Sequence, residues 1–167
     1  PNVLPVHEFG EHGGRPYLVM DYLEGGSLAG WLKQHGKFPP EEAARLIETV
    51  ARGVQAAHEA GVVHRDLKPA NILFKRFDVS HPEPSATAAT LHLGSRFLFP
   101  VVSDFGLAKR MDSGENLTIT GMVMGTPGYM APEQAAGGKS VGPSADLYSL
   151  GVILYQCLTG RIPHDSE

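Results

Sequence analysis

Segment 144–159 constrains the fold most, because apolar side chains surround it on nearly every side. Its apolar residues include Leu147, Leu150, Val152, Ile153, Leu154 and Leu158. A helix that is hydrophobic all round is stable only when neighbouring elements cover it. We therefore expect residues 144–159 to form a helix that is buried in the core of a globular domain.

Apolar patterns elsewhere predict a second helix and several short strands. Residues 40–60 place apolar side chains at three- and four-residue steps, with Glu41 and Glu42 at the start and Gly61 at the end. The expected strands span 3–9, 17–22, 62–63, 72–74 and 101–102, with a turn over 10–14 and a short helix from Leu28. This mixture predicts a single α+β unit.

Composition excludes several classes of protein. The net charge of −4 provides no basic excess for a nucleic-acid partner. Cys157 is the only cysteine, so an intrachain disulfide and a C-x-x-C metal site are both excluded. No segment reaches the roughly 18 apolar residues that a membrane span needs. We expect no nucleic-acid partner and no membrane span in this segment.

The polar segment 64–71 carries the most specific chemical pattern. Its sequence, His-Arg-Asp-Leu-Lys-Pro-Ala-Asn, matches the catalytic-loop pattern H-R-D-L-x-x-x-N at every fixed position. Phosphoryl transfer needs a carboxylate that orients the attacking hydroxyl, a hard metal ligand and a cation that offsets phosphate charge. Asp66, Asn71 and Lys68 supply these groups in turn.

Two further motifs follow in a fixed order, Asp104-Phe105-Gly106 and Ala131-Pro132-Glu133. Each of the three motifs alone is compatible with an ordinary surface turn. Together they resemble the eukaryotic-type (Hanks-type) serine/threonine protein kinases, and segment 125–134 is similar to their bacterial branch. The resemblance covers the chain except for residues 75–100, and it implies serine/threonine phosphorylation with ATP and Mg²⁺.

The resemblance also implies a domain layout. Residues 1–20 correspond to the end of the small lobe, 21–27 to the hinge and 28–167 to a truncated large lobe. The glycine-rich loop, its strand lysine and the paired helix glutamate would precede residue 1, so we expect a partial kinase domain. The interval between Asn71 and Asp104 exceeds that of the family, which predicts a loop insertion over 75–100 at a hairpin tip.

The resemblance assigns roles to individual residues. Asp66 would orient the substrate hydroxyl, with Lys68 and Asn71 as its catalytic partners, and Asn71 and Asp104 would hold Mg²⁺. The implied ATP-binding positions are Met20 as gatekeeper, the hinge residues Asp21 and Leu23, and Ser27, Leu73 and Asp104. The implied activation-segment and structural positions are Arg65, Phe105, Gly106, Thr118, Thr120, Thr126, Glu133 and Asp146.

Some of these roles concern regulation and specificity. Arg65 would pair with a phosphorylated residue, with Thr118 or Thr120 as the candidate and an ordinary polar loop as the alternative. Asp146 would anchor the catalytic-loop backbone or cap its own helix, and both can hold. Ala70 stands where many relatives that select arginine carry glutamate, which argues against strong selection for a substrate arginine.

Two functional hypotheses remain open from the sequence. The first is a protein kinase that acts on serine or threonine residues of other proteins in the cytoplasm, and that can dimerise for autophosphorylation. A membrane anchor outside this segment is compatible with it. The second is an inactive fragment or a pseudokinase-like scaffold, because the phosphate-binding loop and its lysine are not in the sequence.

Overall fold

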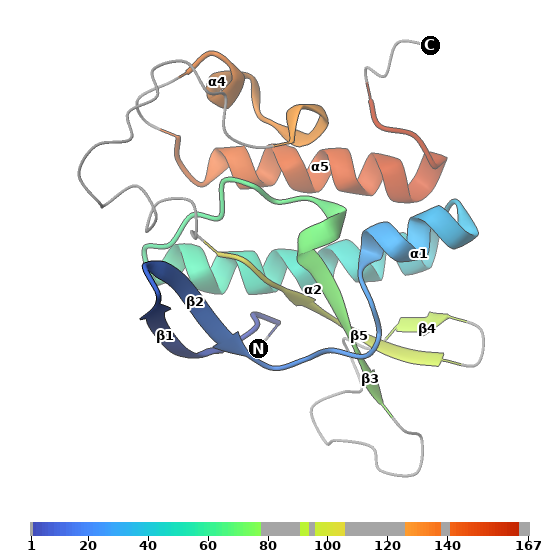
Figure 1. Cartoon of the computed structure of the whole chain (residues 1–167). Coiled ribbons are helices and arrows are strands. Elements are labelled where there is room, and N and C mark those ends of the chain that lie inside the picture. The colour runs from blue at the N-terminus through green and yellow to red at the C-terminus, as the bar shows by residue number, and fades with distance from the viewer. Residues whose placement is uncertain (1, 78–90, 94–95, 106–125, 138–140, 164–167) are drawn as a thin grey trace.

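The structure is a computed structural model that describes residues 2–77, 91–93, 96–105, 126–137 and 141–163 (Figure 1). In chain order the elements are β1 (Val6–His12), β2 (Arg15–Met20), α1 (Leu28–His35), α2 (Pro40–Glu59), the 3-10 turn η1 (Pro69–Asn71), β3 (Ile72–Phe77), β4 (Leu91–Leu93), β5 (Arg96–Val102), the 3-10 turn η2 (Pro127–Tyr129), α4 (Pro132–Ala135) and α5 (Ser144–Thr159). The α+β prediction is confirmed.

Strands β1 and β2 form the expected antiparallel hairpin, with a different turn. The first strand was expected over 3–9 and the turn over 10–14, but β1 continues to His12. Gly10 pairs with Tyr17 across the hairpin, and a Cβ on Gly10 would collide with the Tyr17 ring. Only Gly13 and Gly14 leave the strands, and their φ angles of 59° and 75° are those of a left-handed turn.

A second sheet has the order β3–β5–β4 and is antiparallel throughout. Its register pairs Ile72 with Val102. Residues 75–100 were expected to be a loop insertion at a hairpin tip. Strands β3 and β5 do pair as antiparallel neighbours, but the described residues of the segment are in strands: β3 extends to Phe77, and β4 and most of β5 lie inside it. The hydrophobic side chains of Leu91 and Leu98 are buried there, which gives these strands a reason to form.

The strand expected at 62–63 does not form. The backbone N–H of Val62 instead donates to the carbonyl of Ala57 at 2.9 Å, so the chain turns back against the end of α2. Gly61 has a φ of 78° at this turn, a left-handed conformation that suits glycine after a helix. The apolar pair at 62–63 therefore leads from α2 into the catalytic-loop segment.

Helix α2 lies at the centre of the arrangement. Its buried face consists of Ala43, Leu46, Thr49, Val50, Gly53 and Val54. Contacts join α2 to α5 on one side and to β4 and β5 on the other (Figure 1). The core thus links both long helices to the three-stranded sheet. In the described part of the chain, no helix has both the length and the apolar composition of a membrane span.

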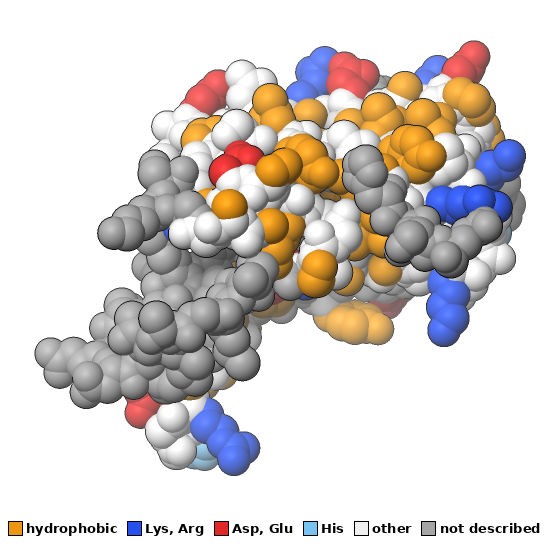
Figure 2. Space-filling model, turned by 90° about the horizontal axis from the view of Figure 1, so that it is seen from above, with side chains coloured by type: hydrophobic (Ala, Val, Ile, Leu, Met, Phe, Trp, Pro, Cys, Tyr) orange, Lys and Arg blue, Asp and Glu red, His pale blue; other side chains and the backbone are white. Residues whose placement is uncertain are grey.

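Helix α5 has the expected bounds, Ser144–Thr159, but it is not buried all round. Leu147, Tyr148, Tyr155 and Leu158 are 61%, 37%, 46% and 38% exposed. The described neighbours of α5 are chiefly α2 and η2, which cover only one side. Figure 2 shows the hydrophobic side chains gathered on the face of the molecule above α5. The prediction of complete burial is therefore wrong for the part of the chain described.

Candidate active site

Asp146 anchors the segment that carries the catalytic pattern. Its buried carboxylate accepts hydrogen bonds from the backbone N–H of His64 at 2.9 Å and of Arg65 at 2.8 Å. The Nε2 atom of His58 lies 2.7 Å from the same carboxylate. A carboxylate that is removed from water is stable only when such donors satisfy it. Asp146 therefore contacts the backbone of the segment that it was expected to anchor, and its anchoring role stays a prediction.

Arg65 adopts a left-handed backbone conformation with a φ of 68°. Such a conformation costs energy for a residue with a Cβ, and it persists where the surroundings impose it. The two backbone N–H groups that donate to Asp146 are those of Arg65 itself and of His64, the residue before it. The strained turn directs the chain into Asp66, the next residue.

His64 connects the catalytic segment to the end of β5. Its Nε2 lies 2.9 Å from the carbonyl oxygen of Ser103, and its Nδ1 accepts from the backbone N–H of Asp66 at 3.3 Å. These partners assign the proton to Nε2, because Nδ1 is the acceptor. The ring is 2% exposed and lies 4.7 Å from the Phe105 ring between centroids. His64 is therefore a packed structural residue.

Asp66, Lys68 and Asn71 lie together at the end of this segment. The Nζ atom of Lys68 is 2.6 Å from Oδ2 of Asp66, and both side chains remain partly exposed, at 25% and 33%. Asn71 donates through Nδ2 to the backbone carbonyl of Asp66 at 2.9 Å. This bond uses the nitrogen end of the amide, so Oδ1 is the end that could bind a cation.

Asp104 comes two residues after the end of β5. Ser103, the residue before it, contacts both Asp104 and Asn71. The Ser103 hydroxyl is 3.2 Å from the carbonyl oxygen of Asn71 and 3.3 Å from Oδ2 of Asp104. Asp104 has a φ of 63°, and its side chain is exposed. Among the described residues it has no cationic partner in an ion pair. The structure thus brings Asp66, Asn71 and Asp104 to one region.

The positions expected to meet adenine and ribose lie at the end of β2, in the hinge segment 21–27 and in β3. Met20 shares a small cavity with Asp104 and Phe105. Oδ1 of Asp21 lies 2.8 Å from Nε2 of His7, within hydrogen-bond distance, and Leu23 is half-buried. The Ser27 hydroxyl accepts from the N–H of Gly30 and caps α1, while its backbone forms a bridge with Leu73. Neither of the two cavities described here includes Asp21, Leu23, Ser27 or Leu73.

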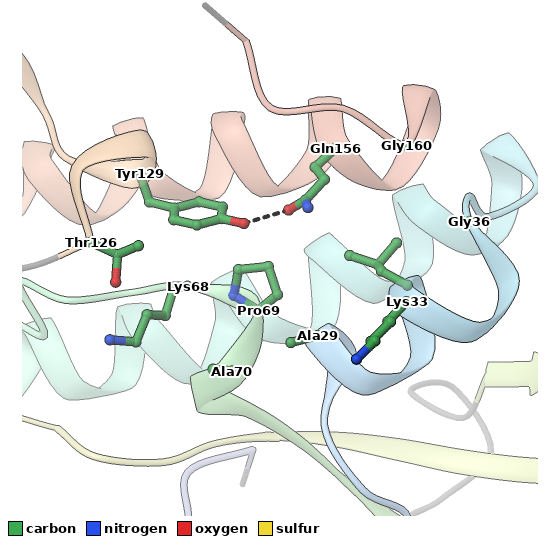
Figure 3. Close-up of a pocket in the computed structure, with 11 residues that line it drawn as sticks. Ala29, Lys33, Gly36, Lys68, Pro69, Ala70, Thr126, Tyr129, Gln156 and Gly160 are labelled. Carbon is green, nitrogen blue, oxygen red and sulfur yellow. Dashed lines mark hydrogen bonds between the residues drawn. The ribbon is translucent and has the colours of Figure 1, made fainter. Parts of the chain in front are cut away.

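A larger cavity of about 480 Å³ lies beside Lys68 (Figure 3). It is lined by Ala29, Leu32, Lys33, Gly36, Lys68, Pro69, Ala70, Thr126, Tyr129, Gln156 and Gly160. Within it, the Tyr129 hydroxyl donates to Oε1 of Gln156 at 2.8 Å (Figure 3). Thr126 and Lys68 therefore face a common space, and no carboxylate belongs to its described lining.

The remaining predicted positions are only partly within the described residues. Glu133 is exposed, and its carboxylate accepts from the Ser144 hydroxyl at 3.4 Å. The Nε atom of Arg65 is buried and has no hydrogen-bond partner among the described residues. Gly106, Thr118 and Thr120 lie outside the described part of the chain, so their roles stay predictions.

Three contacts were not anticipated from the sequence. His58 binds Asp146, Gln134 reaches the catalytic segment, and the Ser149 hydroxyl donates to the carbonyl of Tyr129 at 2.8 Å. All three join segments that are far apart in the chain. Only the position of His58, on the polar edge of an amphipathic helix, gave a local signal, and that signal did not identify its partner.

The anchored loop, the aspartate after β5 and the cavity beside Lys68 are the features of a protein kinase large lobe. The protein kinase domain family matches residues 1–167, and the chain belongs to this family. It is 39% identical to the serine/threonine-protein kinase Pkn1 of Myxococcus xanthus, over 99% of this chain and 21% of that protein. Thus the expected resemblance to this family is confirmed.

Two further relatives are also bacterial. The chain is 36% identical to the serine/threonine-protein kinase PrkC of Bacillus subtilis, over 100% of this chain and 22% of that protein. It is 38% identical to the serine/threonine-protein kinase PknA of Mycobacterium tuberculosis, over 98% of this chain and 34% of that protein. The chain therefore spans between 21% and 34% of the length of these three relatives.

Proposed function

We propose that this protein transfers the γ-phosphoryl group of ATP to serine and threonine hydroxyls of protein substrates. The observation that carries the proposal is the anchored segment that presents Asp66 beside Lys68. Asp66 orients the substrate hydroxyl and accepts its proton during transfer. Lys68 holds the Asp66 carboxylate and contributes positive charge where the phosphoryl group is transferred.

The donor set fits a magnesium-bound nucleotide. Asp104 offers an exposed carboxylate, and Asn71 offers its amide oxygen, both of which are hard ligands. No cluster of three His, Cys, Asp or Glu side chains that could hold a metal ion occurs among the described residues. Asn71 and Asp104 would hold the metal ion together with phosphate oxygens of the nucleotide, as is usual for Mg²⁺ at nucleotide sites. When bound, Mg·ATP supplies the phosphoryl group and neutralises its developing charge.

The adenosine part of ATP is assigned to the hinge. We propose that Met20 limits the depth of the site and that backbone groups of Asp21 and Leu23 meet the adenine. Leu73 would pack beneath the base, and Ser27 would lie near the ribose. The small cavity that Met20 shares with Asp104 and Phe105 supports the placement of Met20, because it puts the end of β2 beside the proposed metal side.

Regulation by phosphorylation is part of the same proposal. The buried Nε atom of Arg65 has no hydrogen-bond partner in the described residues, and phosphate oxygens are strong acceptors for guanidinium groups. We assign the phosphate to Thr118 or Thr120. Autophosphorylation between two copies would require a transient homodimer in the cytoplasm, where ATP is available.

The inactive-scaffold hypothesis is the less favoured one. Every catalytic position that the described segments cover has a residue suited to transfer, including Asp66, Lys68, Asn71 and Asp104. A scaffold needs none of these side chains. A scaffold would bind its partners without transferring phosphate, and that outcome separates the two hypotheses.

The deciding experiment uses the full-length protein, radiolabelled ATP and a generic protein substrate. Asp66→Asn should lower kcat by at least about 100-fold while Mg·ATP binding remains, because the lost group acts on the hydroxyl. Asp104→Asn should weaken Mg·ATP binding itself. Glu24→Gln, at an exposed hinge position, is the matched control. If Asp66→Asn retained more than half of the activity, the assigned role would be wrong.

A further inference from the structure

Gln134 makes a contact that none of the assigned roles explains. Its Nε2 atom donates to the backbone carbonyl of Arg65 at 2.7 Å, across 69 positions in the sequence. Its Oε1 atom accepts from the backbone N–H of Ala131 at 3.2 Å. The two ends of one amide therefore have separate tasks: Oε1 caps α4, and Nε2 reaches the residue before Asp66.

The two peptide bonds that flank Arg65 are thereby each held by one contact. Asp146 accepts from its N–H at 2.8 Å, and Gln134 donates to its carbonyl at 2.7 Å. Arg65 has a φ of 68°, so its backbone needs external contacts to keep this conformation. The carbonyl of Arg65 belongs to the peptide bond that leads into Asp66. Any rotation of that peptide changes the direction of the Asp66 side chain.

The two anchors come from different parts of the fold. Asp146 lies in the first turn of α5, which packs on α2 in the core. Gln134 lies in α4, directly after the segment that contains Thr126 and η2. The bond from Asp146 depends on the core alone. The bond from Gln134 requires, in addition, that α4 and the segment before it adopt the described position.

We propose that Gln134 is a positioning residue that couples the segment ending in α4 to the orientation of Asp66. The inference rests on the proposed kinase activity. Gln134 touches neither substrate nor nucleotide, and it acts through the Arg65 peptide. When α4 and the preceding segment are displaced, the Nε2 donor leaves the Arg65 carbonyl, and the catalytic carboxylate loses its alignment. Small misplacements of this kind are costly for transfer between positioned groups.

The substitution Gln134→Glu tests this role most sharply, because it separates the two bonds. A glutamate keeps an oxygen for the Ala131 N–H, and glutamate is favoured at the third position of a helix. Its ionised carboxylate has no proton to donate to the Arg65 carbonyl. Gln134→Met, which is similar in shape and removes both bonds, is the companion variant.

The proposal predicts a selective effect on turnover in the full-length protein. For Gln134→Glu, kcat should fall roughly tenfold, the effect expected when a polar group loses its partner. The KM values for ATP and substrate should stay within about twofold, and Gln134→Met should give a similar kcat. An exposed Gln34→Glu change on α1 gives the same change in charge away from the site and should have no effect.

A pH profile provides a readout that a purely structural role would not move. Protonated glutamate regains a donor, so the ratio of wild-type to Gln134→Glu kcat should shrink as the pH falls towards about 4.3. Groups that titrate in the same way in both proteins change both kcat values equally, so they cancel in this ratio. The charged or titratable groups of the adjoining loop and helices are His58, His64, Arg65, Asp66, Lys68, Glu133 and Asp146.

Three outcomes would overturn the proposal. The first is a Gln134→Glu protein, folded by circular dichroism, with a kcat within twofold of wild type. The second is a change in KM alone, which would place Gln134 in substrate binding. The third is a kcat ratio that is constant with pH. A different result concerns the proposed function itself. If the wild-type protein binds Mg·ATP but phosphorylates no protein substrate, the kinase proposal is wrong, and the positioning role of Gln134 is wrong with it.

Discussion

The Oδ1 atom of Asp146 lies 2.8 Å from the backbone nitrogen of Arg65, although 81 positions separate them in the sequence. The carboxylate is inaccessible to solvent, and its other oxygen meets both the His64 amide and His58. One buried side chain thus fixes the start of the catalytic segment. Its removal should therefore affect stability as well as activity.

Asp146→Ala should lower the free energy of unfolding by about 3 kcal/mol, because two backbone N–H groups lose their acceptor. Urea denaturation of the full-length protein, followed by circular dichroism, measures this change. Glu24→Gln, at an exposed position, is the control and should change stability by less than about 0.5 kcal/mol. Equal stability of Asp146→Ala and the control would contradict the anchoring role.

Gly25 should not tolerate a side chain. A Cβ at this position would collide with the backbone carbonyl and the Cβ of Phe74, and the Gly25 N–H donates to that carbonyl at 2.9 Å. Gly25→Ala should therefore cost about 1–3 kcal/mol, since the hinge must move away from β3. Thermal unfolding measures the loss.

Gly30→Ala is the matched control for that substitution. Gly30 lies within α1, and its Cβ would meet only the Ser27 hydroxyl oxygen at 3.6 Å. Alanine should stabilise the helix by up to about 1 kcal/mol. The two glycine substitutions are expected to have opposite signs, and a stabilising Gly25→Ala would show that the hinge does not pack against β3 in this way.

Cys157 should be unreactive in the folded protein. Burial raises the pKa of its thiol from 9.0 to about 12, so almost no thiolate is present at pH 8. Cys157 is the only cysteine of this sequence, so a label that peptide mass spectrometry locates in this segment reports on this thiol. We expect labelling to be slow until guanidinium unfolds the protein. Rapid labelling of the native protein at pH 8 would contradict the burial of α5 on this side.

The same pKa shift predicts a pH dependence of stability. Above pH 9 the unfolded thiol ionises while the native thiol stays neutral, so the free energy of unfolding should fall as the pH rises between 9 and 12. A Cys157→Ala protein lacks this titration, and its stability curve should be flatter over that range. Parallel curves for the two proteins would rule out a raised pKa.

Ala70 should limit the selection of basic substrates. The cavity beside Lys68 contains Ala70 and Lys33 in its lining, and no carboxylate belongs to its described wall. Peptides with arginine near the acceptor serine should gain no advantage over alanine peptides. Ala70→Glu should raise kcat/KM for an arginine peptide by roughly fivefold, the strength of one partly exposed ion pair.

A second glutamate substitution tests whether the arginine preference comes from a direct ion pair at position 70 or from added negative charge anywhere on the surface. Gln34→Glu adds the same charge on α1 at an exposed position outside the cavity lining. It should leave the arginine preference unchanged, because exposed charges that are not in contact are screened by salt. A preference for arginine in the wild-type protein would show that another acidic group serves the cavity.

Local sequence patterns were sufficient for much of the molecule. The amphipathic repeat predicted α2 within one residue at its end, and the expected bounds of α5 agree with Ser144–Thr159. The catalytic pattern over 64–71 identified Asp66, Lys68 and Asn71, which the structure places together. These features are local, because helix periodicity and a catalytic loop are each written in a few consecutive residues.

The failures were those that depend on distant neighbours. Val62 and Val63 have strand-like side chains, yet the backbone closes the end of α2. Strand β4 forms inside the expected loop insertion, because β5 offers it an edge. Because α5 is apolar on nearly every side, its sequence did not indicate which of its sides would pack against the described elements. Hydrophobicity states that a side chain favours burial, but only packing decides what buries it.

The sequence by itself determined the family of this chain and the limits of its two long helices, and it named the side chains that we propose as catalytic. The tertiary structure decided which groups hold those side chains in place. Gln134 and Asp146 meet the catalytic segment from two separate elements, and His58 meets Asp146 from a third. The physical reason is that a hydrogen bond requires atoms about 3 Å apart, and for residues far apart in the chain that distance is set by packing of the whole core.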